Sequence, residues 1–248
     1  MVDDIEIQEI DKLVATARKA QQNYEARGSQ EIFDLACQAV GWALMQPENN
    51  NELSKLAVSE TGLGNVQDKI QKNHNKTLGL LRDLKDIKSF GHIYDDDVKG
   101  LSVYFRPKGV IAAIVPSTNP LATPTNNIIN ALKTGNSIIV APSPKGAEPF
   151  AVLLKHIRKN LADVGIDPNL VQMVPTPPSK PKTQRLMELA DLLVVTGSQN
   201  NVRAGYSSGT PALGVGQGNV VTIIDETADV GDAAEKIAKS KTFDNATS

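Results

Sequence analysis

The sequence predicts an α/β fold, a Rossmann-like doubly wound parallel sheet with an N-terminal helical layer and a projecting β-hairpin. Three observations predict it. Helix formers dominate residues 1–88, strand signals flank a turn within 89–106, and short apolar runs alternate with helical segments from 107 to 248. Apolar runs of strand length that are each followed by a helix are typical of a parallel sheet covered on both faces. We take these three ranges as the parts of the chain.

The N-terminal part carries a clear amphipathic helix in SQEIFDLACQAVGWAL, where Ser29 is a suitable cap. Its apolar residues recur at helical spacing: Ile32, Leu35, Ala36, Ala39 and Val40. In the next part, GHIYDDDVKGLSVYFRP, Tyr94 and residues 103–105 indicate two strands around a turn at 95–100. A hairpin is the simplest structure for this part.

The third part repeats a strand-then-helix pattern: VIAAIV and PTNNIINALKTG, SIIVA and PFAVLLKHIRKNLADVG, LVQMV and QRLMELA, DLLVV and NVRAGYSSG. Gly165 marks the end of one helix, and Asp167 with Pro168 turns the chain into the next strand. A last helix carries an apolar stripe: Ala233, Ala234, Ile237 and Ala238. These boundaries support the doubly wound arrangement.

Composition excludes several classes of function. The formal net charge is -2, with both signs interspersed, so no broad cationic face is expected for nucleic acid or a membrane surface. The acidic start lacks the features of a signal peptide, and the longest apolar run, GVIAAIVP, is too short to span a bilayer. The one cysteine, Cys37, fits a reducing compartment, and we expect a cytoplasmic protein without a metal site.

Ligands of open parallel sheets bind beyond the carboxyl ends of the strands, so the residues after each apolar run are the candidates for a site. Four such junctions stand out: PSTNP at 116–120, APSPK at 141–145, TGS at 196–198 and LGVGQGN at 213–219. Taken singly, each has an ordinary structural explanation. PSTNP and APSPK are rigid turns, Ser198 caps a helix, and GxGxG between two strand-like runs is a tight turn rather than the GxGxxG dinucleotide fingerprint.

Together with the phrases ALKTGNSIIVAPSP and IIDETADV, the four junctions resemble the aldehyde dehydrogenase superfamily, in particular its coenzyme A-acylating branch. The resemblance runs from about Arg106 to the last residue. It implies a cysteine that attacks an aldehyde, a nicotinamide cofactor that accepts hydride, and a thioester passed to coenzyme A. In acylating members the cysteine follows a phrase similar to SKTFDN, and the matching position lies immediately beyond Ser248. We therefore expect the chain to lack both nucleophile and catalytic domain and to be inactive, with Cys37 a structural thiol.

The resemblance also assigns site residues. Asn119 would hold an oxyanion, although the asparagine of hydrolytic relatives aligns with Thr118. Gly214 stands where those relatives carry the glutamate that activates water, which favours coenzyme A as acceptor. Ten residues are expected to contact the cofactor: Val115, Pro116, Ser117, Thr118, Ser143, Lys145, Thr196, Gly197, Ser198 and Gly214.

The cofactor is NADP or NAD, and the sequence leans to NADP. Two positions that hold a lysine and a glutamate against the adenosine ribose in hydrolytic relatives are Ala141 and Pro144 here, whereas Ser143 and Lys145 are suited to a 2'-phosphate.

The expected substrates are a small aldehyde and coenzyme A, and the expected assembly is a homo-oligomer whose contacts involve the hairpin. The ending FDNATS and the phrase SQNNVRAGYSSGTPALGVGQGN are more similar to members that act on sulfoacetaldehyde than to those that act on acetaldehyde or propanal. Two alternatives stay open: a nucleotide-binding module or short form without chemistry of its own, and a hydrolytic aldehyde dehydrogenase, which Gly214 disfavours.

Overall fold

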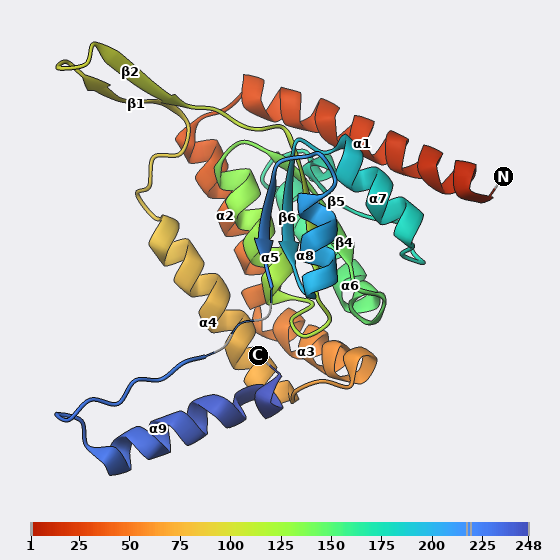
Figure 1. Ribbon diagram of the computed structural model, residues 1–248. Helices are drawn as coiled ribbons and strands as arrows, with labels where there is room; N and C mark the ends of the chain where they lie inside the picture. The colour runs from red at the N-terminus through yellow and green to blue at the C-terminus, as the bar shows by residue number, and fades with distance from the viewer. Residues whose placement is uncertain (1, 217, 219, 248) are drawn as a thin grey trace.

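The protein is described by a computed structural model that covers residues 2–216, 218 and 220–247 (Figure 1). Its helices are α1 (Val2–Ala26), α2 (Gln30–Met45), α3 (Pro47–Thr61), α4 (Val66–Leu84), α5 (Ala122–Lys133), α6 (Ala147–Asp163), α7 (Lys180–Leu189), α8 (Gln199–Tyr206) and α9 (Val230–Thr242). Its strands are β1 (Gly91–Asp96), β2 (Leu101–Phe105), β3 (Val110–Val115), β4 (Ser137–Pro142), β5 (Val171–Met173), β6 (Leu192–Thr196) and β7 (Ala212–Val215). Three short 3₁₀ helices complete it: η1 (Pro144–Gly146), η2 (Pro168–Leu170) and η3 (Phe243–Ala246).

The central sheet confirms the predicted doubly wound α/β fold. Five parallel strands lie in the order β5-β4-β3-β6-β7, so the chain winds outward from β3 in one direction and then returns to add β6 on its other side. Every residue of β3 and β4 is buried, which explains why both read as continuous apolar runs. The order of the strands reverses between β3 and β6, and a crevice is expected at their carboxyl ends.

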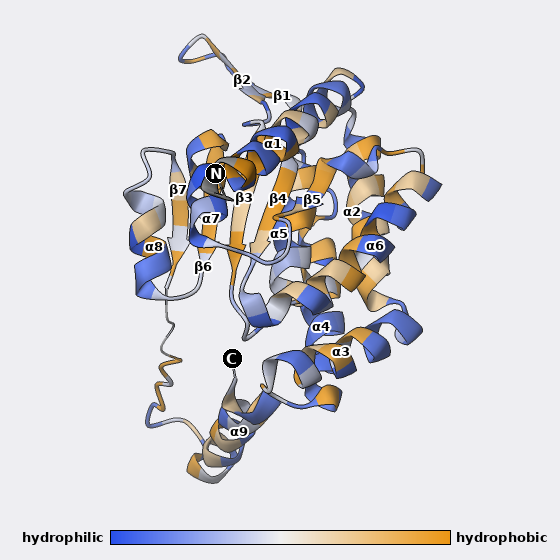
Figure 2. Ribbon diagram, turned by 90° about the vertical axis from the view of Figure 1, so that its right-hand side faces the viewer, coloured by the Kyte–Doolittle hydropathy of each residue, from blue (hydrophilic) through white to orange (hydrophobic). Residues whose placement is uncertain are grey.

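Helices cover both faces of the sheet, and the N-terminal helices divide between them. One core joins α2, α5 and α6 to residues such as Ile111 and Val140. The other joins α1 and α7 to Ala112, Ile139 and Leu193, with α8 beside them (Figure 2). The N-terminal part is thus not one layer, because the buried stripe of α1 packs with α7 while α2 packs with α5 and α6.

Helix α2 begins where the sequence predicts it, and the Ser29 side chain accepts a hydrogen bond from the Ile32 amide. The predicted stripe is rotated, however. Leu35 is 40% exposed, whereas Phe33, which the stripe omitted, is fully buried. Tyr24 and Phe90 both contact the Phe33 ring, so residues distant along the chain determine which side of the helix faces the core.

One carboxylate fixes the amino ends of β3 and β6. Asp191 accepts hydrogen bonds from the Val110 amide at 2.7 Å and from Arg18 of α1 at 2.8 Å. Gly109 lies against it with φ of 128°, where an added Cβ would stand 2.2 Å from Asp191 Oδ2. Only glycine fits this combination of conformation and contact.

The predicted hairpin is present: β1 and β2 pair antiparallel and project from the rest of the protein (Figure 1). His92 and Tyr104 are directly opposite and their rings make an edge contact. Several of its large side chains are exposed: Tyr94, Val98, Leu101, Tyr104 and Phe105. No helix of the described residues is long and apolar enough to cross a membrane.

The C-terminal segment differs most from the sequence-based expectation. The strand-like run at 220–224 is exposed and unpaired in the structure, and Gln217 and Asn219 of LGVGQGN lie outside the described residues. Helix α9 forms as predicted, but none of its residues is buried. Farther on, the buried carboxylate of Asp244 binds Lys69 and Lys72 of α4, which attaches η3 to that helix. Sequence periodicity could not reveal this attachment, because ion pairs between distant segments leave no periodic signal.

Candidate functional site

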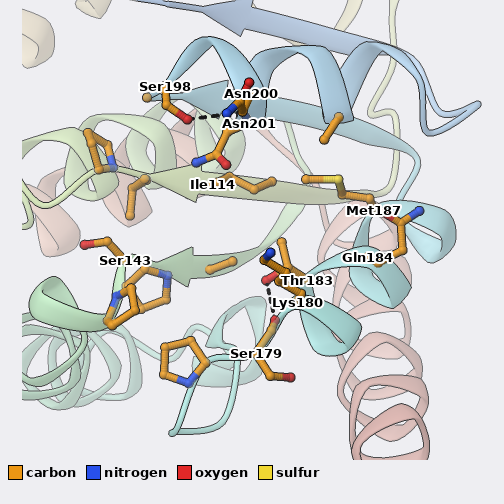
Figure 3. Close-up of a pocket in the computed structure, with 18 of the residues that line it drawn as sticks. Ile114, Ser143, Ser179, Lys180, Thr183, Gln184, Met187, Ser198, Asn200 and Asn201 are labelled. Carbon is orange, nitrogen blue, oxygen red and sulfur yellow. Dashed lines mark hydrogen bonds between the residues drawn. The ribbon is translucent and has the colours of Figure 1, made fainter. Parts of the chain in front are cut away.

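A cavity of about 800 Å³ lies at the carboxyl ends of β3, β4 and β6, at the reversal of strand order (Figure 3). Its lining comes from five segments: residues 114–117 at the end of β3 and beyond, 141–144 at the end of β4 and beyond, 178–187 at α7, 197–198 after β6, and 200–204 on α8. Most of the lining is apolar or uncharged, as in many small-molecule sites. The fold therefore collects three of the four predicted junctions in one cavity.

Six predicted cofactor residues line this cavity: Val115, Pro116, Ser117, Ser143, Gly197 and Ser198. The other four are not part of its lining: Thr118, Lys145, Thr196 and Gly214. Asn119, the expected oxyanion residue, is not part of it either. Those in the first group lie at the end of a strand or in the two positions that follow it. Those in the second lie one or two residues farther along, at the end of β6 before the turn, or on the edge strand β7.

The junctions after β3 and β4 are held together by the backbone. The Ser143 amide donates to the Val115 carbonyl at 3.1 Å, which continues the ladder by one bond beyond the strands. Gly146 then approaches Pro120 closely, since a Cβ on Gly146 would stand 3.0 Å from Pro120 Cβ. This close approach gives the cavity a fixed wall on the β4 side.

Ser143, a residue of the cavity lining, carries an unsatisfied polar atom. Its Oγ is buried, and it has no hydrogen-bond partner among the residues that the structure describes. A buried hydroxyl without a partner costs roughly 1–3 kcal/mol. A polar atom of a bound ligand would remove that cost.

The junction after β6 is a turn that starts a helix. Gly197 has φ of 155°, and its amide donates to the Val215 carbonyl of β7. Ser198 caps α8 as predicted, because its Oγ accepts a hydrogen bond from the Asn201 amide at 3.3 Å. The amino end of α8 therefore borders the cavity, where its partial positive charge favours anionic groups such as phosphates.

The sequence-based prediction missed the side of the cavity formed by α7 and α8. Lys180, Gln184 and Met187 come from α7, and Asn201 and Ala204 come from α8. One signal was available: the run LVQMV is β5, and the loop that follows it leads to α7, so the same junction rule applies there. The helical residues gave no signal, because their position depends on how α7 and α8 pack.

Gly214 has a structural reason to be glycine. A Cβ at this position would lie 2.7 Å from Val202 Cγ1 and 2.8 Å from Tyr206 Cε2 of α8. The Gly214 amide donates to the Tyr206 hydroxyl at 3.0 Å. A longer side chain would have to displace these two side chains of α8.

The one cysteine is buried and is not part of the cavity lining. Cys37 is 4% exposed, and its Sγ donates to the Ile129 carbonyl at 3.4 Å. Burial raises the pKa of its thiol to about 12, with a smaller opposing effect from Lys133. The group is therefore protonated at neutral pH and is a poor nucleophile. Among the described residues, no group of three or more histidine, cysteine or acidic side chains is placed to bind a metal ion.

We expect Cys37 to react with iodoacetamide far more slowly in the folded protein than after unfolding. A pKa raised from 9.0 to about 12 lowers the thiolate fraction at pH 8 by about a thousandfold. The same shift favours the folded state below pH 9, and this contribution is lost as the pH rises from 9 through 12. Alkylation followed by mass spectrometry measures the rate at which Cys37 reacts. Equal rates before and after unfolding at pH 8 would contradict the burial of the thiol.

Comparison with known proteins agrees with this arrangement. The model of the aldehyde dehydrogenase family matches residues 1–246. A sulfoacetaldehyde dehydrogenase (acylating) from Cupriavidus necator is 57% identical over 95% of this chain and 48% of its own length. An acetylating aldehyde dehydrogenase from Geobacillus thermoglucosidasius superposes with a TM-score of 0.91 at 34% identity, covering 98% of this chain and 54% of the other.

A further solved structure carries a nucleotide. An engineered glycolyl-CoA reductase with bound NADP+ superposes with a TM-score of 0.82 at 32% identity, over 95% of this chain and 53% of the other. The chain spans about half the length of the relatives that it matches.

Proposed function

Since the chain belongs to the aldehyde dehydrogenase family, we propose that it is the cofactor-binding part of a coenzyme A-acylating enzyme. The reaction of the whole protein would be aldehyde, coenzyme A and NAD(P)+ to acyl-coenzyme A and NAD(P)H. One observation carries the proposal: the cavity lies at the strand reversal of a doubly wound sheet, between the amino end of α8 and the loops after β3 and β4. Dinucleotides bind at this place in such sheets.

The residues of the cavity fit a nicotinamide dinucleotide. Ser198 and the first amides of α8 would bind the pyrophosphate, and the wall near Ser143 would contact the adenosine ribose. The nicotinamide would lie beside Val115, Pro116 and Ser117. When bound, it supplies the acceptor for the hydride. Asn119 would stabilise an oxyanion from the β3 side, and Thr118, Thr196 and Gly214 would contribute at the margin of the site.

Coenzyme A is the proposed acceptor because position 214 holds no general base. A glutamate there would have to displace the side chains of Val202 and Tyr206. A thiol is intrinsically more nucleophilic than water and needs less activation. The 57% identity to an acylating sulfoacetaldehyde dehydrogenase supports this branch and a sulfonated aldehyde as substrate. In the whole protein, accumulation of free acid in place of acyl-coenzyme A would contradict the assignment.

We also propose NADP in preference to NAD. The cavity lining, within the described residues, contains no carboxylate, so no acidic side chain there pairs with the ribose hydroxyls or repels a 2'-phosphate. The exposed aromatic residues of the hairpin support a role in contacts between copies of the protein.

We keep the division of the chain into residues 1–88, 89–106 and 107–248. A cytoplasmic location is also proposed, because a free buried thiol suits a reducing compartment.

A nucleotide-binding module without chemistry of its own is the second candidate. The observation in its favour is Cys37, the one cysteine, which is buried and protonated and cannot serve as nucleophile. Both candidates require the same cofactor cavity. They differ in whether the whole protein turns over an aldehyde in the presence of coenzyme A.

We expect Ala204→Trp to weaken dinucleotide binding at least about tenfold. Ala204 is exposed and lines the cavity, so an indole there would occupy the ligand's volume without disturbing the core. Isothermal titration of the chain with NADP+ and NAD+ measures the effect, with Ala204→Ser as the control that keeps the wild-type affinity. If the chain bound neither dinucleotide, or if the tryptophan variant bound as well as wild type, the cavity would not be the cofactor site.

A further inference from the structure

One cation faces the cofactor cavity. Lys180, the first residue of α7, is the single charged side chain in the described lining, and no aspartate or glutamate accompanies it there (Figure 3). We propose that Lys180 is a specificity-determining residue that binds the 2'-phosphate of NADP+ together with Ser143. This inference rests on the proposed function and names the group that selects the cofactor.

Ser143 supplies the second contact. Its backbone is fixed by the bond from its amide to the Val115 carbonyl, and its buried Oγ is without a partner among the described residues. A hydroxyl at this position can donate to a phosphate oxygen, while the ammonium group of a lysine can approach the same phosphate from the other side. Figure 3 shows the two residues on different sides of the cavity, Ser143 after β4 and Lys180 on α7.

Nearby polar groups are already engaged, which leaves Lys180 as the cation for the ligand. Lys182, two residues farther along, is buried and donates to the carbonyls of Pro175 and Pro177. Ser179 caps α7 through the Lys182 amide and donates to Glu6 of α1. These bonds fix the loop before α7, so the backbone of Lys180 is positioned before any ligand binds.

Lys145, which the sequence favoured for this role, is placed differently. It is exposed on η1 and does not belong to the cavity lining. It follows Pro144, which is the last residue of this loop in the cavity lining. Lys145 therefore offers a matched control: the same side chain, also in the first turn of a helix, outside the site.

The test compares Lys180→Gln with Lys145→Gln in the 248-residue chain by isothermal titration. We expect Lys180→Gln to weaken NADP+ binding about tenfold and to change NAD+ binding less than about twofold, because only NADP+ carries the phosphate. Lys145→Gln should leave both affinities unchanged. Ser143→Ala should also act on NADP+ alone, by about threefold to tenfold. Thermal unfolding of each variant confirms that the fold is retained.

Two further probes identify the phosphate that is recognised. Adenosine 2',5'-bisphosphate represents NADP+, and adenosine 3',5'-bisphosphate represents the nucleotide end of coenzyme A. A loss in Lys180→Gln that is larger for the 2',5' compound supports the proposal. A larger loss for the 3',5' compound, or equal losses for NADP+ and NAD+, overturns it while leaving the cofactor site intact. If wild type binds neither dinucleotide, the proposed function fails and this inference fails with it.

Discussion

Replacing Gly109 by alanine is expected to lower the free energy of unfolding by about 4 kcal/mol. At φ of 128°, an alanine is strained by roughly 1–3 kcal/mol. Its Cβ would also stand 2.2 Å from Asp191 Oδ2 and displace that carboxylate. The displaced group would lose its bonds from Val110 and Arg18, at a further cost of roughly 1–3 kcal/mol.

Urea denaturation followed by circular dichroism measures this loss, and Gly79→Ala is the matched control. Gly79 lies inside α4, and an added Cβ there meets nothing within 4 Å. Alanine at that position should raise stability by about 0.5–1 kcal/mol, because it restricts the unfolded chain and favours the helix. A Gly109→Ala protein that unfolds at the wild-type urea concentration would show that the contact with Asp191 does not restrain the strand.

Phe33→Ala is expected to cost about 3–5 kcal/mol, since it removes a large side chain that is fully buried. The Phe33 ring lies 4.7 Å from the ring of Tyr24 and 5.0 Å from that of Phe90, centroid to centroid. Two glycines, Gly28 and Gly135, allow the chain to pass close to its edge. Because these neighbours belong to different segments, they cannot all move in to fill the space.

Leu35→Ala on the same helix is the control for this substitution. Leu35 is 40% exposed, so its truncation should change stability by less than about 0.5 kcal/mol. Thermal and urea unfolding of both variants give the comparison. Equal losses would mean that α2 faces the core with the stripe first expected from its sequence.

Most of the fold was predictable from the sequence because burial determines the pattern of residues. A strand such as β3, with helices on both faces, can hold only apolar residues, and its run was therefore recognised. The facing side of α2 was not predictable. Apolar residues occur on more than one side of that helix, and Tyr24 and Phe90 decide which side is covered.

The candidate site was predictable to a similar extent. Junctions after parallel strands meet at one edge of a sheet, and three of the four proposed junctions line the cavity. Lys180 and Ala204 were not found, since their place depends on the packing of α7 and α8. The fourth junction lies at the edge strand β7, and the strand expected after it is not formed in the described chain.

The pairing of α1 with α7 has a consequence for biosynthesis. Ile10 and Val14 belong to the same core as Leu186 and Leu193, although some 180 residues separate them along the chain. A ribosome adds about 5–20 residues per second, so roughly 10 to 40 s pass between the synthesis of the two groups. The nascent chain carries an incompletely covered apolar helix during that interval, the kind of surface that chaperones bind. Helix α1 is thus synthesised well before the residues that complete its packing.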